Sequence, residues 1–155
     1  MRENMGLYRG KRKDNGEWAE GNLFENDNSN FPMVLIGHVI MSRDKHFPQD
    51  LSFDGYGLEE VDPETVGQFT GLTDNNGEKI FEGDIIHYQK SDIVCVGIIR
   101  FGEYSLPGLH LGFNVEWVSP DAVDFRKDIR FWAICREISV VGNIHDNPEL
   151  IEVRI

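Results

Sequence analysis

The stretch Thr70-Gly71-Leu72-Thr73-Asp74-Asn75-Asn76-Gly77-Glu78-Lys79-Ile80-Phe81-Glu82-Gly83-Asp84-Ile85-Ile86 places two turns between apolar segments. Asp74 to Gly77 predicts a reverse turn, because aspartate, asparagine and glycine accept the backbone conformations that turns require. Glu82-Gly83-Asp84 predicts a tighter corner, with Gly83 at the bend and Asp84 accepting hydrogen bonds from backbone N–H groups there. We therefore expect three strands between residues 68 and 88, joined by a turn and a corner.

Further strands are predicted on the carboxyl side of this stretch. Residues 93–101 are almost uniformly apolar, 115–118 predict a shorter strand, and 130–144 predict a long final one. Ser119-Pro120-Asp121 is typical of a helix start, which predicts two helical turns over residues 120–127. Short strands with glycine-rich turns are typical of small barrels. We expect a mainly β protein built on a small antiparallel β-barrel, SH3-like or related, with one or two short helices.

The amino-terminal side predicts a β-hairpin and a long loop. Residues 7–24 predict the hairpin, because Asp14-Asn15-Gly16 favours a tight turn and Trp18 starts the return strand. Residues 32–41 predict a buried strand. Residues 46–60 contain proline and several glycines and predict an irregular loop, which at that length commonly carries function.

These two sides define the expected domain organisation. Residues 1–65 are expected to form the hairpin and strand region with its loop, and residues 66–155 to form the barrel. Asp62-Pro63-Glu64 predicts a short helical turn near the boundary, with Asp62 as the N-cap and Pro63 at the first helical position. We expect the two regions to pack as one compact unit.

The charge of the 155-residue chain is −12 and unevenly distributed, since residues 14–84 contain sixteen acidic and three basic side chains. An acidic surface repels nucleic-acid phosphates, which disfavours general nucleic-acid binding. A basic segment flanked by Tyr8 and Trp18 is the exception and offers a weak candidate nucleic-acid contact, formed by Arg9, Lys11, Arg12 and Lys13. The alternative interpretation of these four residues is a solvated hairpin rim.

Targeting signals and metal-ligand spacings are missing from the sequence. No apolar stretch approaches the roughly 20 residues of a membrane-spanning helix, and no apolar segment follows Met1 as in a signal peptide. Cys95 and Cys135 lie inside apolar runs and match no metal-ligand spacing. We expect a reduced, intracellular protein with no membrane contact.

The stretch from Thr70 to Ile86 resembles the signature "TGL-D-NG--I-EGDI" of the YopX family of phage and prophage proteins. Residues 8–18 are similar to the family's amino-terminal hairpin, and residues 141–150 are similar to its "GNI--NPEL" ending. Residues 25–60 and 102–112 carry no motif of this family. The resemblance implies a mostly β protein encoded by a phage or prophage and located in the cytoplasm of the bacterial host. It implies no established activity and supplies no catalytic residues.

We interpret the residues of these motifs as architectural, because turns and corners explain them without chemistry. The structural motif consists of Gly71, Asn76, Gly77, Glu82, Gly83, Asp84, Gly142, Asn143 and Pro148.

Catalytic interpretations are weaker. Glu82 and Asp84 lie two residues apart and would share one face of a strand, as an acid/base pair could, with His87 nearby. The corner explains Asp84 equally well. The histidines are scattered singly, and Cys95 lies between valines, where a thiol is unreactive. We expect no catalytic residue, no metal site and no cofactor.

Seventeen aromatic residues exceed the need of one small barrel core. Six fall in loops or at strand ends and form a candidate interaction surface, namely Phe47, Phe53, Tyr56, Tyr104, Phe113 and Trp117. The alternative is that they pack on the protein's own core. We predict a non-enzymatic module that binds another protein, either a copy of itself or an unidentified host or phage protein. The alternative function is an accessory role in nucleic-acid processes, through the basic segment or through an acidic surface that competes for a DNA-binding protein.

Overall fold

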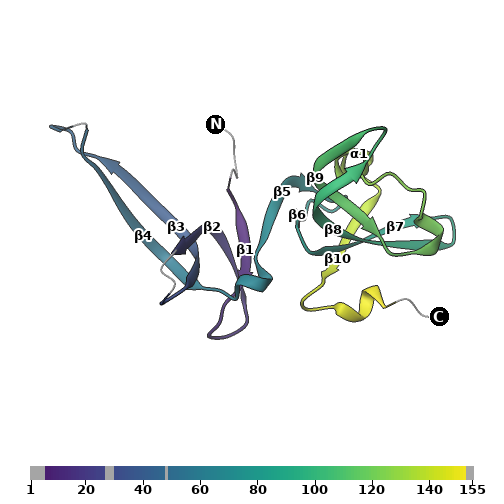
Figure 1. Cartoon of the computed structure of the whole chain (residues 1–155), viewed down its shortest axis with the longest axis horizontal. Helices are drawn as coiled ribbons and strands as arrows, with labels where there is room; N and C mark the ends of the chain where they lie inside the picture. The colour runs from purple at the N-terminus through teal and green to yellow at the C-terminus, as the bar shows by residue number, and fades with distance from the viewer. Residues whose placement is uncertain (1–5, 27–29, 48, 153–155) are drawn as a thin grey trace. The chain divides into compact units, whose positions relative to one another are not determined.

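The computed structural model describes residues 6–26, 30–47 and 49–152, except for the side chain of Phe53. The chain divides into two compact units, unit 1 with residues 1–68 and unit 2 with residues 69–155 (Figure 1). Both units are mainly β and their sheets are antiparallel, as the sequence predicts. No helix among the described residues is long and apolar enough to cross a membrane.

Unit 1 is an antiparallel sheet with the strand order β4-β3-β2-β1-β5. Its elements are β1 (Tyr8–Lys11), β2 (Trp18–Asn26), β3 (Met33–Arg43), β4 (Leu51–Glu60), the 3₁₀ helix η1 (Pro63–Thr65) and the start of β5 (Gly67–Thr73). The predicted hairpin is present, with Gly16 at φ +72° in its turn. The predicted helical turn is η1, where the Asp62 carboxylate accepts a hydrogen bond from the N–H of Glu64 at 3.0 Å.

Strand β4 shows that the loop predicted for residues 46–60 is wrong. Residues 51–60 pair with β3, from Leu35↔Glu60 to Arg43↔Leu51. The glycines that suggested a loop serve the strand instead. Gly57 has φ +59° next to a register shift, and a Cβ at Gly55 would lie 2.7 Å from the Leu58 Cδ1 atom. A bulge and a close side-chain approach both favour glycine within a strand.

Unit 2 contains a four-stranded antiparallel sheet with the order β10-β7-β8-β9, and β6 pairs with β5. Its strands are β6 (Lys79–Phe81), β7 (Asp84–Lys90), β8 (Ile93–Ser105), β9 (Leu109–Trp117) and β10 (Ile138–Asn143). Its helices are the 3₁₀ helices η2 (Pro120–Ala122) and η3 (Pro148–Ile151) and the α-helix α1 (Ile129–Cys135). The central stretch thus forms the strands and turns that its residues predict.

The core of unit 2 lies between this sheet and α1. One cluster contains the buried side chains of Ile80, Ile86, Ile99, Val115, Ile129, Trp132 and Ile138. Trp132 contacts the rings of Tyr88 and Trp117 at centroid distances of 4.9 and 5.2 Å. Interlocked aromatic rings of this kind add to the stability that burial provides.

Helix α1 corrects the long strand predicted for residues 130–144, of which only residues 138–143 form β10. Asp128 caps the helix by accepting the Arg130 N–H at 3.0 Å, and Ile129 and Trp132, one turn apart, are buried. Arg136 ends the helix in the left-handed conformation. The helix predicted for residues 120–127 is reduced to η2. Tertiary packing of Trp132 outweighs the β propensity of this apolar run.

The predicted barrel is also wrong, because neither sheet of the described chain closes on itself. Part of each edge of the four-stranded sheet bonds to a neighbouring segment. The Val115 N–H of β9 donates to the Lys127 carbonyl at 2.8 Å, and the Val140 N–H of β10 donates to the Asp74 carboxylate at 2.8 Å. Backbone groups bonded in this way cannot pair with the edge of another sheet.

Candidate functional site

A two-stranded projection of unit 1 is the candidate site. Strand β2 pairs with residues 33–37 of β3, from Asn26↔Met33 to Asn22↔Gly37. After Gly37, β3 pairs with β4 alone among the described strands, from His38↔Tyr56 to Arg43↔Leu51. We call the described residues 38–47 and 49–56 the hairpin arm (Figure 1). A two-stranded ribbon without a third strand is at best marginally stable in water.

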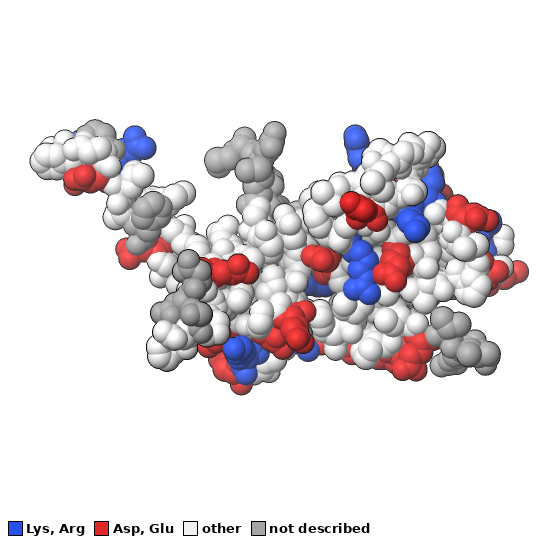
Figure 2. Space-filling model, in the orientation of Figure 1, with Lys and Arg blue, Asp and Glu red and all other residues white. Residues whose placement is uncertain are grey.

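The hairpin arm exposes large apolar side chains. Five of them are more than half exposed, namely Ile40, Met41, Phe47, Leu51 and Tyr56. The face in Figure 2 shows charged groups at the tip of the arm and an acidic group between the tip and the base, with uncharged surface between them. Large apolar side chains exposed together on one projecting element are typical of protein-interaction sites.

Among the described side chains, one face of the hairpin arm is mostly apolar and carries one charged group, Arg43, next to Leu51 near the tip. Side chains alternate between the two faces of a strand, so Val39 and Met41 share a face, and register places Leu51 there through its pairing with Arg43. Leu58, two residues beyond the arm, has its side chain over Gly55 and so lies on the same face. We call Val39, Met41, Leu51 and Leu58 the apolar stripe.

The opposite face of the hairpin arm is more polar. The rings of His38 and Tyr56 stack at 5.3 Å with an interplanar angle of 28°, and the hydroxyl groups of Ser42 and Ser52 share a hydrogen bond. The two faces of the arm therefore differ, and the apolar stripe is the one suited to burial.

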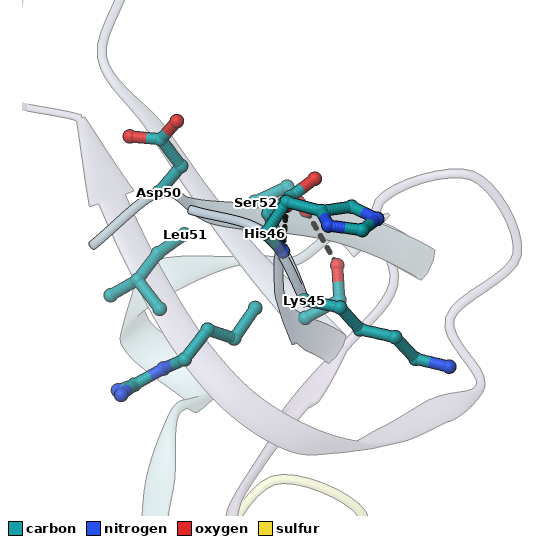
Figure 3. Close-up of a pocket in the computed structure, with 8 residues that line it drawn as sticks. Lys45, His46, Asp50, Leu51 and Ser52 are labelled. Atoms are coloured by element: carbon teal, nitrogen blue, oxygen red, sulfur yellow. Dashed lines mark hydrogen bonds between the residues drawn. The ribbon is translucent and has the colours of Figure 1, made fainter. Parts of the chain in front are cut away.

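The tip of the hairpin arm forms a polar concavity of about 520 Å³ (Figure 3). The Asp44 carboxylate shapes it by accepting the N–H groups of His46 and Phe47 at 2.6 and 2.9 Å. The side chains of Lys45 and Asp50 point in opposite directions (Figure 3). These contacts describe a well-hydrogen-bonded turn in which the charged groups do not converge.

The six predicted surface aromatics fall in both units. Phe47 and Tyr56 lie on the hairpin arm, and Phe53 pairs with Met41 in its register, although the Phe53 side chain lies outside the described residues. Tyr104 in unit 2 stacks on His110 at 5.5 Å.

The other two predicted aromatics pack within unit 2. Phe113 contacts Phe101 at 5.1 Å and lies against the core cluster. The Trp117 ring contacts Trp132, and its Nε1–H donates to the Arg126 carbonyl at 2.9 Å. These two side chains therefore have the intramolecular contacts that the alternative interpretation expects.

Aliphatic residues are what the sequence reasoning missed. Ile40, Met41 and Leu51 are exposed on the hairpin arm, and Leu109 and Leu111 are exposed on the β8–β9 hairpin of unit 2. The predicted surface, which consisted of aromatic residues alone, did not include them. The sequence signal that could have indicated this exposed surface is a pair of aliphatic segments on either side of a polar turn. It was ambiguous, because the same pattern predicts a buried strand.

The basic residues near the N-terminus have intramolecular contacts. The guanidinium of Arg9 lies 4.7 Å and the ammonium of Lys11 lies 5.7 Å from the Trp18 ring centroid. Arg12 pairs with the carboxylates of Asp14 and Glu59 at 2.6 and 3.2 Å, and Lys13 pairs with that of Glu60 at 3.1 Å. The hydrogen bond to Asp14 raises the pKa of Arg12 and lowers the pKa of Asp14. Nucleic-acid contact through these residues stays a prediction.

The first motif turn is tied to β10. Asp74 is buried, and its Oδ1 accepts the N–H groups of Asn76 and Glu78 at 2.8 and 2.9 Å. Its Oδ2 accepts the Val140 N–H. Gly77 closes the turn with φ +81°, and Gly71, on the preceding strand β5, has φ +83°. One carboxylate thus holds the turn and anchors a distant strand.

The second motif corner meets the carboxyl-terminal motif. The buried Asp84 carboxylate accepts the Phe81 N–H at 2.7 Å, and Asp84 pairs with Asn143 in the β7–β10 register. Gly83, at φ +88°, accepts the Ile144 N–H at 2.9 Å through its carbonyl. Two motifs separated by about sixty residues therefore form one joint.

The carboxyl-terminal motif forms a tight turn of its own. The Asn143 Oδ1 atom accepts the N–H groups of His145 and Asp146 at 3.0 and 2.9 Å. Gly142 leaves room for the Asn147 side chain, which a Cβ would meet, and Pro148 is the first residue of η3.

The residues considered for catalysis do not form one group. Glu82 is half-buried in the turn before β7, so it does not share a strand with Asp84. His87 lies three residues further along β7, and burial lowers its pKa. Burial, followed by the charge of Asp121, raises the pKa of the Cys95 thiol. Within the described residues, no three His, Cys, Asp or Glu side chains are placed to hold a metal ion.

Comparisons with known proteins agree with this fold. The chain is similar to protein EF1440 from Enterococcus faecalis, whose crystal structure superimposes with a TM-score of 0.55 at 25% sequence identity over 94% of this chain and 97% of that chain. A comparison with curated proteins finds none that matches. The family model described as "YopX protein" matches residues 7–152, nearly the whole chain. The chain therefore belongs to the YopX family.

Proposed function

We propose that this protein is a non-enzymatic, phage- or prophage-encoded protein-binding module that associates with a second copy of itself through the hairpin arm. The observation that carries the proposal is the exposure of Met41 and Leu51 on a ribbon to which no third strand of the described residues pairs. Covering the apolar stripe removes this surface from water, and each buried aliphatic side chain contributes about 1.5–3 kcal/mol to association.

The roles of the motif carboxylates agree with a binding module. Asp74 and Asp84 direct their oxygens to backbone N–H groups and hold turns of unit 2. Chemistry is not needed to explain them. The hairpin arm, in contrast, offers surface beyond what its own fold needs.

Sedimentation velocity across a concentration series tests the proposal. We expect the wild-type protein to associate in the micromolar range, and the double variant Met41→Lys/Leu51→Lys to remain monomeric, because two charges in the apolar stripe oppose burial. Both side chains are exposed, so the variant should keep the wild-type circular dichroism spectrum.

The matched control is Val123→Lys, which adds a charge at an exposed apolar side chain of unit 2. This variant should associate like the wild type. A wild-type protein that stays monomeric at high micromolar concentration contradicts the proposal. Equal association of the arm variant and the wild type moves the interface elsewhere and also contradicts it.

A further inference from the structure

Unit 2 contains a groove, lined by both apolar and polar residues, on the face of its sheet that is opposite the core. Val94 and Val96 alternate with the buried Cys95 along β8, so they lie on the other face of this strand. Together with Val118 they line a groove of about 450 Å³ that Leu150 and Ile151 of η3 also line. A groove of this volume is at the lower end of the range for ligand sites.

Hydrogen bonds join Val96 on the floor of the groove to the segment that forms one of its walls. The Val96 carbonyl accepts the Val118 N–H at 2.9 Å, and the Val96 N–H donates to the Ser119 hydroxyl oxygen at 2.7 Å. Pro148 begins η3 and so sets the direction of the segment that carries Leu150. The floor and one wall are therefore fixed before anything binds, which lowers the entropic cost of binding.

The charge at the groove has one sign. Glu149 and Glu152 are exposed and belong to its lining, and the described lining residues include no lysine or arginine. Val94 is 43% exposed, so part of the apolar floor faces water. A ligand that complements this groove combines an aliphatic side chain for the valines with a cation for the carboxylates.

We propose that this groove binds a short basic peptide segment, with an aliphatic side chain over Val94, Val96 and Val118 and a lysine or arginine beside Glu149 and Glu152. The proposal goes beyond self-association and does not depend on the hairpin arm. It also gives a contact surface to Glu149 and Leu150, which the sequence analysis identified only as part of the carboxyl-terminal motif.

The test is a titration of the ¹⁵N-labelled full chain with the peptide acetyl-Arg-Leu-Leu-Arg-amide, followed by heteronuclear NMR. We expect saturable shifts of the backbone signals of Val94, Val96 and Val118. The peptide acetyl-Glu-Leu-Leu-Glu-amide should produce none of them. Equal affinity for the two peptides, no binding of either, or shifts confined to other residues overturns the proposal.

Charge variants make the test specific. The double variant Glu149→Gln/Glu152→Gln should weaken binding of the basic peptide by about three- to tenfold, as the loss of two exposed charge pairs predicts. The control Glu103→Gln/Glu137→Gln removes two exposed charges outside the groove lining and should bind as the wild type does. Equal weakening in both variants means a diffuse charge effect and overturns the proposal.

Two further variants of this chain test what occupies the groove. The Met41→Lys/Leu51→Lys variant should bind the peptide unchanged, so failure of self-association and failure of the groove are distinguishable. A variant that ends at Glu152 should also bind as the full chain does. If only this shortened variant binds the peptide, the groove serves the chain's own last three residues and the proposal is wrong.

Discussion

Unit 1 and unit 2 are both antiparallel, but they bury very different numbers of apolar side chains. Among the described residues, unit 1 buries Ile36 and Val61, whereas unit 2 buries a cluster of seven and further side chains around it. In unit 1, the Val61 and Ile36 side chains fill the space beside Gly10. A Cβ there would lie 3.0 Å from Val61 and 3.1 Å from Ile36. The comparison teaches that unit 2 carries its own core, while unit 1 leaves apolar surface for contact.

The largest effect should come from removing core volume in unit 2. We expect Trp132→Ala to lower the free energy of unfolding by about 3–5 kcal/mol, because the ring is buried and touches several other rings. Leu51→Ala on the hairpin arm should change it by less than about 0.5 kcal/mol. Urea denaturation at a concentration that keeps the protein monomeric measures both. Similar losses for the two variants would contradict the contrast between the units.

A smaller effect should separate a long-range carboxylate from a local one. Asp74→Ala should cost about 2–3 kcal/mol, because three backbone N–H groups lose a charged acceptor, including that of Val140 on a different strand. Asp62→Ala in unit 1 removes a single local cap to Glu64 and should cost about 0.5–1 kcal/mol. Thermal unfolding followed by circular dichroism ranks the two. The reverse order would mean that the turn of unit 2 is not anchored to β10.

Turn glycines should behave alike in both units. Gly16 and Gly77 have φ +72° and +81°, with open space where a Cβ would lie. Replacing either one with alanine should cost about 1–2 kcal/mol, from backbone strain alone. The control is Gly102→Ala, where φ is not positive and space is open, and it should be neutral or slightly stabilising. Chemical denaturation of the three variants checks this, and a cost confined to one unit would show that packing contributes to the turn.

The smallest effect is a pH dependence specific to unit 2. Burial lowers the pKa of His87 below its ordinary value of 6.5. As the pH falls below 6.5, His87 is therefore protonated more readily in the unfolded chain than in the folded one. Stability from this group is complete above pH 6.5 and falls as the pH decreases below that value. We expect His87→Gln to flatten the stability profile below pH 6.5 relative to the wild type, in urea titrations at several pH values. Parallel profiles would contradict the assignment.

Sequence reasoning succeeded where a few neighbouring residues decide the structure. The hairpin turn at Gly16, the corner at Gly83 and the helical turn after Asp62 depend on local backbone geometry and nearby hydrogen bonds. It failed for β4 and α1, whose segments carry mixed local signals. The glycines of β4 led to the prediction of a loop. The apolar residues of α1 led to the prediction of a strand, although Trp132 packs this helix on the core.

The candidate site was only partly accessible from the sequence. Phe47 and Tyr56 were predicted as surface residues, and both are exposed on the hairpin arm. The aliphatic members of the apolar stripe were not, since a strand of such residues reads as buried. The groove of unit 2 joins residues more than fifty positions apart, and no sequence spacing indicates it.

The sequence by itself determined where this chain turns, because positive φ angles and carboxylate caps act within a few residues of glycine or aspartate. Only the tertiary structure decided which apolar side chains are covered. Ile36 and Met41 belong to the same strand, yet Ile36 is buried beside β2 and Val61, whereas Met41 is 71% exposed beyond the last residue that β2 reaches. Burial depends on partners from distant parts of the chain, and those partners are set by the fold and not by the strand itself.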